Sequence, residues 1–244
     1  MKRIYALVIA VFAVLSVDAK LLDGYGQTTI GYNPLQMSSN ANGIGVETLH
    51  GVEVSYIHGF RLLQKLPLYL EVGAGIQANF AGDAGKMWDH FTSSKALSSL
   101  DKDNAFVMCR LNIPINVAWK FQVAKILALT PYVGVNLGFN LFAWDGESIF
   151  KRYGRAYTES INLDGQQEDL IYMYYPHRFQ FGGQVGVRLS VLRFNAGISY
   201  HRDFMAFDEK EYMLTSRTIA NAIYGTDVVK RRTGYVVLSF GFGF

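Results

Sequence analysis

The sequence is poor in residues that crosslink a chain or interrupt regular structure. Cys109 is the single cysteine among 244 residues, which excludes an internal disulfide. Only 5 prolines occur, against 24 glycines, so few positions resist continuous backbone pairing. After the first 20 or so residues no apolar run reaches the ~20 residues that a membrane-spanning helix needs. The body of the chain is therefore not predicted to cross a membrane with helices.

Neither positive nor negative charge predominates in the sequence. The formal net charge is +3, and charged residues make up 18% of the chain. A net charge this small does not indicate nucleic acid as a partner. The five histidines lack the spacing of metal ligands, and no glycine-rich phosphate loop occurs. We therefore expect no cofactor, no metal and no nucleic acid.

The N-terminus has the pattern of a secretory signal. Lys2 and Arg3 precede residues 4–17, which are apolar except for Ser16, and Ala19 is the last of the small residues that follow. This pattern predicts a signal peptide at 1–19 and a mature domain at 20–244. An uncleaved membrane anchor is the alternative, but the apolar run is shorter than a spanning helix.

Period-two alternation of apolar and polar residues recurs along the mature chain. In residues 107–121, Leu111, Ile113 and Val117 share one face, and Arg110 and Asn112 lie on the other. Such alternation predicts β-strands with one apolar and one polar face. Eight segments show it: 24–33, 52–56, 68–80, 107–121, 126–144, 178–191, 194–201 and 236–244.

Alternation alone does not decide whether the apolar faces point inward or outward. The connections near residues 61–66, 122–126 and 192–193 are short, and those near 34–47, 81–104, 145–177 and 205–232 are long. Short connections at one end of the sheet and long connections at the other are typical of transmembrane barrels. Since lipid offers no hydrogen-bond partners, a spanning sheet must close on itself. The sequence predicts an all-β protein, an eight-stranded antiparallel transmembrane β-barrel with short periplasmic turns and long extracellular loops. A periplasmic sandwich is the alternative.

Two details refine this prediction. Pro114 lies inside a predicted strand and lacks a backbone donor, so we expect a β-bulge or one broken ladder bond there. Aromatic residues should form belts at both membrane interfaces. The outer belt would contain Tyr32, Phe80, Phe106, Phe139, Trp144, Phe179 and Tyr200.

The last residues carry a pattern of their own. Phe240, Phe242 and Phe244 alternate with small residues up to the final position. This ending resembles the C-terminal signal of bacterial outer-membrane proteins. The resemblance implies that the barrel-assembly machinery reads these residues during biogenesis.

Four segments resemble a known family. They are residues 111–121 (LNIPINVAWKF), 131–138 (PYVGVNLG), 181–186 (FGGQVG) and 195–200 (NAGISY). They are similar to the porin-like outer-membrane β-barrel domain, a family that includes the PorT-type component of type IX secretion. The resemblance implies an eight-stranded barrel in the bacterial outer membrane, in contact with outer-membrane lipid and lipopolysaccharide.

The inward faces carry several charged or titratable residues. An eight-stranded barrel is just wide enough to be filled by side chains, so charges inside it must be paired. We expect a structural plug of ion pairs in preference to a gate. The predicted lumen network consists of Glu53, Glu71, Arg110, Lys120, Arg178, Arg188 and His201, with Glu53 level with Arg110, and Glu71 near Lys120 and Arg188.

Ser199 and His201 share a face, with Asp203 following, and this spacing permits nucleophilic chemistry on lipid A. The sequence shows no oxyanion hole and no oriented third group, so no enzyme is predicted. The long connections are the expected seat of surface binding, including a protein partner. Basic and aromatic residues gather at 151–157 and at Tyr172, Tyr174 and Tyr175. A short amphipathic helix at residues 209–224 is expected to pack on the barrel mouth through Tyr212, Ile219, Ile223 and Tyr224.

These features favour a non-enzymatic outer-membrane barrel with a structural or surface-binding role. Two alternatives stay open. One is a lipid A-modifying enzyme in the same fold, and the other is an accessory component of type IX secretion.

Overall fold

The computed structural model describes residues 24–63, 65–81, 106–124, 126–163 and 165–243. These residues form one 13-stranded sheet in which every recorded strand pairing is antiparallel. The predicted signal at 1–19, the connection 82–105 and Phe244 lie outside the described residues.

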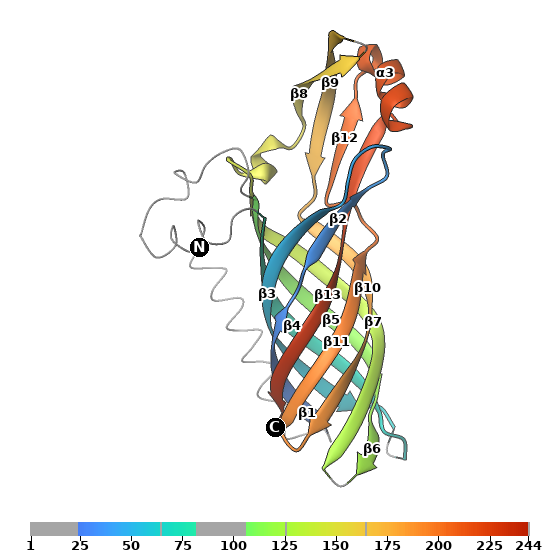
Figure 1. Ribbon diagram of the computed structural model, residues 1–244. Coiled ribbons are helices and arrows are strands. Elements are labelled where there is room, and N and C mark those ends of the chain that lie inside the picture. Colours follow the sequence, from blue (N-terminus) through green and yellow to red (C-terminus); the bar gives the residue numbers. More distant parts are fainter. Residues whose placement is uncertain (1–23, 64, 82–105, 125, 164, 244) are drawn as a thin grey trace, which may run out of the picture.

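Eight of the strands close into a barrel (Figure 1). Each strand pairs with the next, and β13 pairs with β1, with Thr28 opposite Phe242. The predicted eight-stranded barrel is confirmed. Its strands are β1 (Gly24–Tyr32), β3 (Glu47–Arg61), β4 (Leu68–Ala81), β5 (Phe106–Trp119), β7 (Leu127–Trp144), β10 (Phe179–Val191), β11 (Phe194–Asp203) and β13 (Val228–Gly243).

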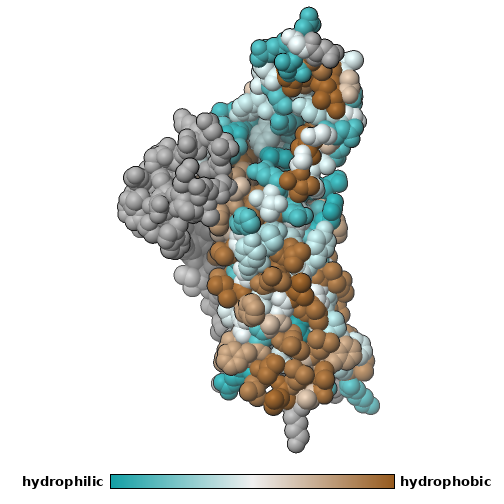
Figure 2. Space-filling view, in the orientation of Figure 1, coloured by the Kyte–Doolittle hydropathy of each residue, from teal (hydrophilic) through white to brown (hydrophobic). Residues whose placement is uncertain are grey.

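Polarity in the barrel is the reverse of that in a water-soluble protein. Along β5, Arg110, Asn112 and Asn116 are buried, and Leu111, Ile113 and Ile115 between them point outward. Val133 is 60% exposed and Phe240 is 67% exposed on the outer surface. Figure 2 shows apolar side chains gathered over the lower part of the barrel, and hydrophilic ones above. An outward apolar band around a polar interior is the arrangement of a transmembrane β-barrel of the outer-membrane type.

The predicted short connections are found at one end of the barrel. The chain turns between Arg61 and Leu68, between β10 and β11, and through the short strand β6 (Phe121–Ala124). Leu192 adopts a positive φ of 57° in the tight turn before β11. The pairing of β4 with β5 runs to Val72–Ile115 and resumes at Gly75–Asn112, so the ladder is interrupted beside Pro114 as predicted.

Three of the long connections, those near residues 34–47, 145–177 and 205–232, extend the structure above the barrel mouth (Figure 1). The sheet continues from β13 to β12, β9 and β8, and β2 joins β13 to β3. We call this part of the structure the extension. Its elements are β2 (Leu35–Ser39), the 3-10 helix η3 (Ile149–Arg152), β8 (Arg155–Leu163), β9 (Gln166–Pro176), β12 (Asp208–Tyr212) and α3 (Leu214–Tyr224).

The prediction of a helix at residues 209–224 that packs on the barrel mouth was wrong in its start and its position. Residues 208–212 form strand β12 because they pair with both β9 and β13, so α3 starts only at Leu214. Tyr212 is therefore a strand residue. The helix contacts β9 and lies at the far tip of the extension, away from the barrel mouth (Figure 1).

Among the residues with a described structure, no helix has the length and apolar character needed to cross a membrane.

An apolar cluster fills the extracellular end of the barrel. Phe106, predicted in the outer aromatic belt, is buried in this cluster, with its ring 6.2 Å from that of Phe207. The belt assignment of Phe106 was wrong because it shares the inward face of Met108 and Arg110. We call this cluster the apolar cap. Its buried members are Leu35, Met37, Leu49, Phe106, Met108, Ala143, Ile149, Tyr174, Phe207, Tyr235 and Val237.

Candidate functional site

Below the apolar cap, an ion pair crosses the lumen. The Arg110 guanidinium donates two hydrogen bonds to the Asp203 carboxylate, at 2.6 and 2.8 Å, and both side chains are buried. Thr233 donates a further hydrogen bond to Asp203. Paired hydrogen bonds between guanidinium and carboxylate fix both side chains and satisfy their buried charges. Asp203 was not assigned to the predicted network, although the alternation through Ser199 and His201 places it on the inward face.

A second ion pair lies toward the periplasmic end. Glu71 on β4 accepts hydrogen bonds from Arg188 on β10, from the Tyr25 hydroxyl and, at 3.2 Å, from Asn116. Glu71 and Arg188 are both buried. Side chains from four strands thus meet at the Glu71 carboxylate. Glu71 and Arg188 lie at the same level of the barrel, as the strand directions predict.

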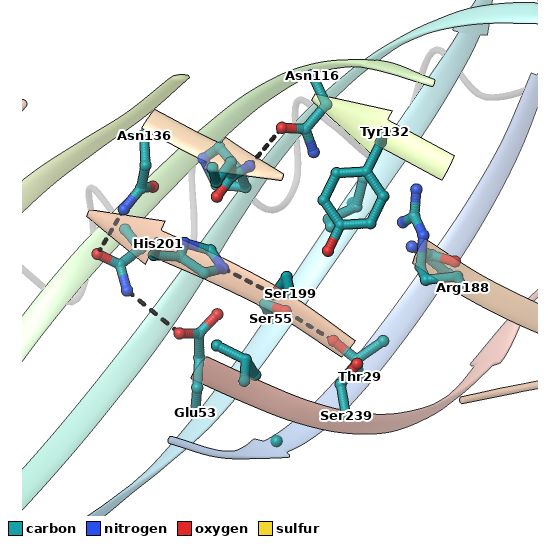
Figure 3. A pocket seen from close by; sticks show the side chains of 17 residues that line it. Thr29, Glu53, Ser55, Asn116, Tyr132, Asn136, Arg188, Ser199, His201 and Ser239 are labelled. Atoms are coloured by element: carbon teal, nitrogen blue, oxygen red, sulfur yellow. Dashed lines mark hydrogen bonds between the residues drawn. The ribbon is translucent and has the colours of Figure 1, made fainter. Parts of the chain in front are cut away.

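Side-chain amides fill the space between the two ion pairs (Figure 3). Asn112 donates to Glu53 at 3.3 Å and to Gln77 at 2.8 Å, and Asn136 donates to Asn112 at 3.3 Å. The cavity that remains between the two ion pairs measures about 40 Å³. A water molecule needs about 10–15 Å³ on this measure, so the cavity has room for only a few waters.

Two of the predicted network residues lie at the ends of the barrel. Lys120 follows β5 at the periplasmic end, with its ammonium 4.7 Å from the centre of the Tyr25 ring. Arg178 was predicted inside the lumen, and this was wrong. It precedes β10, is exposed, and stacks on the Phe150 ring at 4.3 Å outside the lumen. The alternation of β10 begins only at Phe179, so it does not set the direction of Arg178.

His201 lies inside the lumen and contacts Ser199. The Ser199 hydroxyl is 2.9 Å from His201 Nε2, and the two residues are 6% and 9% exposed. The imidazole stacks on the Tyr235 ring at 4.6 Å. Within the described residues His201 Nδ1 has no hydrogen-bond partner, and Asp203 is bound to Arg110. A serine–histidine pair is thus present without a carboxylate that orients the ring.

The terminal phenylalanines of the predicted assembly signal reach the lipid-facing surface where they are described. Phe240 and Phe242 are exposed on the outside of β13. The Phe242 ring contacts that of Phe194 at 5.7 Å. Phe244 lies outside the described residues.

A larger pocket lies in the extension, above the apolar cap. It has a volume of about 320 Å³, and strands β8, β9, β12 and β13 each supply part of its wall. We call it the tyrosine pocket. Its lining residues are Ile44, Asp145, Arg152, Tyr157, Tyr172, Tyr174, Asp208, Lys210, Val229 and Arg231.

The cations of the tyrosine pocket are all bound to carboxylates. Arg152 donates two hydrogen bonds to Asp145, at 2.5 and 2.9 Å. Lys210 donates to Glu159 at 2.9 Å. Arg231 donates two hydrogen bonds to Asp208, which also accepts one from the Tyr174 hydroxyl. The charged side chains are therefore held in place before any ligand arrives.

Burial sets the protonation of the pocket's hydroxyls. It raises the pKa of Tyr172, and burial together with the nearby Asp208 carboxylate raises the pKa of Tyr174. Both phenols are therefore neutral at physiological pH, and that of Tyr174 donates a hydrogen bond to Asp208. The sequence pointed to Tyr172 and Tyr174, but not to Asp208 or Arg231, which only the pairing of β12 with β9 and β13 brings beside them.

No protein-family model and no curated protein matches this sequence. Among solved structures, the chain resembles Ail, the attachment invasion locus protein of Yersinia pestis, with 11% identity and a TM-score of 0.42 over 91% of this chain and 100% of that one. It also resembles Neisserial surface protein A, with 14% identity and a TM-score of 0.41 over 91% and 100%. The outer-membrane enzyme PagL aligns with 8% identity and a TM-score of 0.39 over 89% and 98%. The porin-like, PorT-type resemblance stays a prediction, and the eight-stranded barrel is established by the strand pairings of this structure.

Proposed function

We propose that this protein is a closed outer-membrane barrel with a structural or surface-binding role, and that solutes do not pass through it. The observation that carries the proposal is the filled lumen. The Arg110–Asp203 and Glu71–Arg188 ion pairs cross it at two depths, and about 40 Å³ of cavity remains between them. An eight-stranded barrel leaves no further space for a path.

The apolar cap supports the same role. Met108 and Phe207 are among its fully buried members at the extracellular end of the lumen. A hydrated ion would have to lose water against these side chains and then separate an ion pair. Losing hydration costs an ion several kcal/mol or more in such surroundings. The barrel thus serves as a rigid base for the extension.

The route to the membrane is part of the proposal. Residues 1–19 would direct export and be removed, and the barrel-assembly machinery would read Phe240, Phe242 and Phe244. The exposed apolar band would then contact outer-membrane lipid, with lipopolysaccharide around the extension. A protein partner could also bind the extension.

Planar bilayer recording tests the closed state. The purified mature protein, reconstituted beside an open porin as a positive control, is expected to give no stable conductance steps of porin size. Such steps from the wild-type protein would falsify the closed barrel. Loss of the steps after addition of a barrel-specific antibody would exclude a contaminant as their source.

The serine–histidine contact favours a second candidate, a lipid A-modifying enzyme. Against it, Ser199 and His201 face the lumen and are nearly inaccessible, whereas acyl chains lie outside the barrel. A nucleophile also needs an oriented base, and His201 has no carboxylate on Nδ1 among the described residues. We expect identical lipid A mass spectra from cells producing wild type or Ser199→Ala. An acyl chain lost only with wild type would establish the enzyme.

A role as a secretion accessory is the third candidate, and it requires a stable partner. Extraction of the native membrane in mild detergent separates this role from the first. Co-purification of a secretion component in a fixed ratio would favour it. Recovery of the barrel alone would favour the structural or surface-binding role.

A further inference from the structure

The tyrosine pocket adjoins the apolar cap. Tyr174 belongs both to its lining and to the apolar cap, so the cap forms the floor of the pocket. Its volume of about 320 Å³ lies within the range of small-molecule binding sites, roughly 300–1,000 Å³. The pocket therefore has the size of a small-molecule binding site.

The lining restricts the chemistry of the occupant. Five of the ten lining residues are charged, three are tyrosines and two are aliphatic. A purely apolar molecule would remove water from these charged side chains without replacing its hydrogen bonds, which is unfavourable. The occupant must therefore offer many hydrogen-bonding groups.

The ion pairs argue against an anion. Each cation in the lining is already bound to a carboxylate: Arg152 to Asp145, Lys210 to Glu159 and Arg231 to Asp208. Glu147 contacts Arg152 as well, at 2.5 Å. A phosphate or sulfate would have to displace a carboxylate or lie beside it, and neighbouring like charges repel. The pocket thus has no uncompensated positive charge for an anionic ligand.

The tyrosines favour a ligand with both apolar faces and polar edges. The ring of Tyr157 lies 6.0 Å from that of Tyr172 and 6.3 Å from that of Tyr174, so three rings form one cluster on the wall. Tyrosine rings supply a large apolar area together with a hydroxyl. Pyranose sugars match this surface because their ring faces carry C–H groups and their rims carry hydroxyls.

We propose that the tyrosine pocket binds the uncharged sugar rings of an oligosaccharide at the cell surface. This inference rests on the proposed surface-binding role and assigns its ligand class. The aromatic cluster holds the faces of one or two rings, and the paired Asp145–Arg152 and Asp208–Arg231 groups accept and donate to the hydroxyls. Rigid, already paired side chains lose little entropy on binding.

Calorimetric titration of the purified protein in a sugar-free detergent tests the proposal. The probes are mannotriose, maltotriose and triacetylchitotriose, with dextran sulfate fragments as the anionic counterpart and intact lipopolysaccharide as the membrane-attached source. We expect at least one uncharged trisaccharide to bind at millimolar concentration or below, and dextran sulfate not to bind more tightly. If lipopolysaccharide binds as well, its sugar chains are the source of the uncharged rings at the cell surface.

Two pocket variants and one matched control assign the site. Tyr157→Ala removes a ring from the cluster, and Arg152→Gln changes a residue on η3 outside the sheet. Each is expected to weaken trisaccharide binding by about tenfold or more. Tyr175→Ala is the control, because Tyr175 lies on the opposite face of β9 from Tyr172 and Tyr174 and packs against Tyr153. The control should leave the affinity within about twofold of wild type. Resistance of each variant to limited proteolysis establishes that the extension is folded.

The proposal is overturned if no uncharged trisaccharide binds, if only dextran sulfate or intact lipopolysaccharide binds, or if both pocket variants bind as well as the control. These failures differ from a failure of the proposed function. A protein that binds no sugar but shows no conductance would still be a closed barrel, whereas a conducting one would not.

Discussion

Arg110 on β5 and Asp203 on β11 face each other across the closed lumen and share two hydrogen bonds, at 2.6 and 2.8 Å. The two residues are 93 positions apart, and their pairing ties opposite walls of the barrel together. The other lumen side chains are arranged above and below this contact. The apolar cap covers it, and the Glu53–Asn112–Asn136 amide network lies beneath.

Arg110→Ala should strongly destabilise the barrel. It leaves Asp203 buried without its main partner, and breaking such a pair lowers the free energy of unfolding by about 3–5 kcal/mol. Urea titration of protein refolded into lipid vesicles measures the loss. Arg152→Ala is the control, since its pair with Asp145 is partly exposed and should contribute about 1 kcal/mol or less. Equal losses for the two variants would contradict a dominant role for the lumen pair.

The Glu71–Arg188 pair should behave as a coupled unit. Glu71→Met or Arg188→Met alone leaves one buried charge unpaired, so each should lower the free energy of unfolding by about 3–5 kcal/mol. The double variant removes both charges and should recover a large part of that loss. A double-mutant cycle in the same urea assay gives the coupling. Purely additive losses would show that the two residues act independently.

Gly138→Ala should disturb the same lumen contact from the backbone side. A Cβ at Gly138 would overlap the Arg110 guanidinium, which is held by Asp203. We expect a loss of about 1–3 kcal/mol, as for overpacking of a filled interior. Gly45→Ala is the matched control, because a Cβ there has nothing within 4 Å. If Gly138→Ala were as stable as Gly45→Ala, the lumen would be looser than the structure shows.

Val185→Lys tests which side of the barrel meets lipid. Val185 is 53% exposed at the middle of β10, and its neighbours Val133 and Tyr200 also face outward. A lysine at the bilayer midplane should lower the free energy of unfolding in vesicles by about 2–4 kcal/mol. Leu214→Lys on α3, where the side chain is 80% exposed in the extension, should change it by about 0.5 kcal/mol or less. Similar small effects at both positions would place β10 in water.

Stability of the extension should fall in acid through Glu159. Burial acts to raise the pKa of Glu159, but hydrogen bonds from Lys210, Tyr224 and Tyr212 outweigh it and hold the pKa below the ordinary value of 4.5. A carboxyl with a lowered folded pKa stabilises the fold above its unfolded pKa, and this contribution is lost as the pH falls through the folded pKa.

Amide hydrogen exchange, corrected for its intrinsic pH dependence, measures this effect in β8 and α3. Protection should be full at neutral pH and decline once the pH falls below about 4.5. Glu159→Gln should have weaker protection at neutral pH and little further decline in acid. An acid-induced loss of the same size in Glu159→Gln would assign the effect to another group.

The barrel could be predicted from the sequence because each strand shows the alternation of apolar and polar residues within its own segment. A strand that crosses lipid must expose apolar residues at every second position, as in the Leu111, Ile113 and Val117 series of β5. The same periodicity also predicted the level at which Glu71 and Arg188 lie in the barrel. It did not predict the position of the Arg178 side chain, because Arg178 lies just outside a strand. It also did not predict the burial of Phe106, because the inward face becomes apolar above the lumen.

The extension could not be read in the same way. Residues 208–212 become strand β12 only because β9 and β13 lie on either side of them, and α3 is consequently displaced to the tip. Asp208 and Arg231 reach the tyrosine pocket through the same pairings. These contacts join residues far apart in the chain, and no short pattern in either segment encodes them.

The amino-acid order by itself determined the eight alternating strands, their polarity and the end of the barrel at which connections are short, because a lipid environment imposes those features strand by strand. Only the tertiary structure decided the partner of Arg110, the apolar cap and the ion-paired tyrosine pocket. Those features depend on which side chains meet across a closed sheet, and that depends on closure, shear and pairing of the whole molecule.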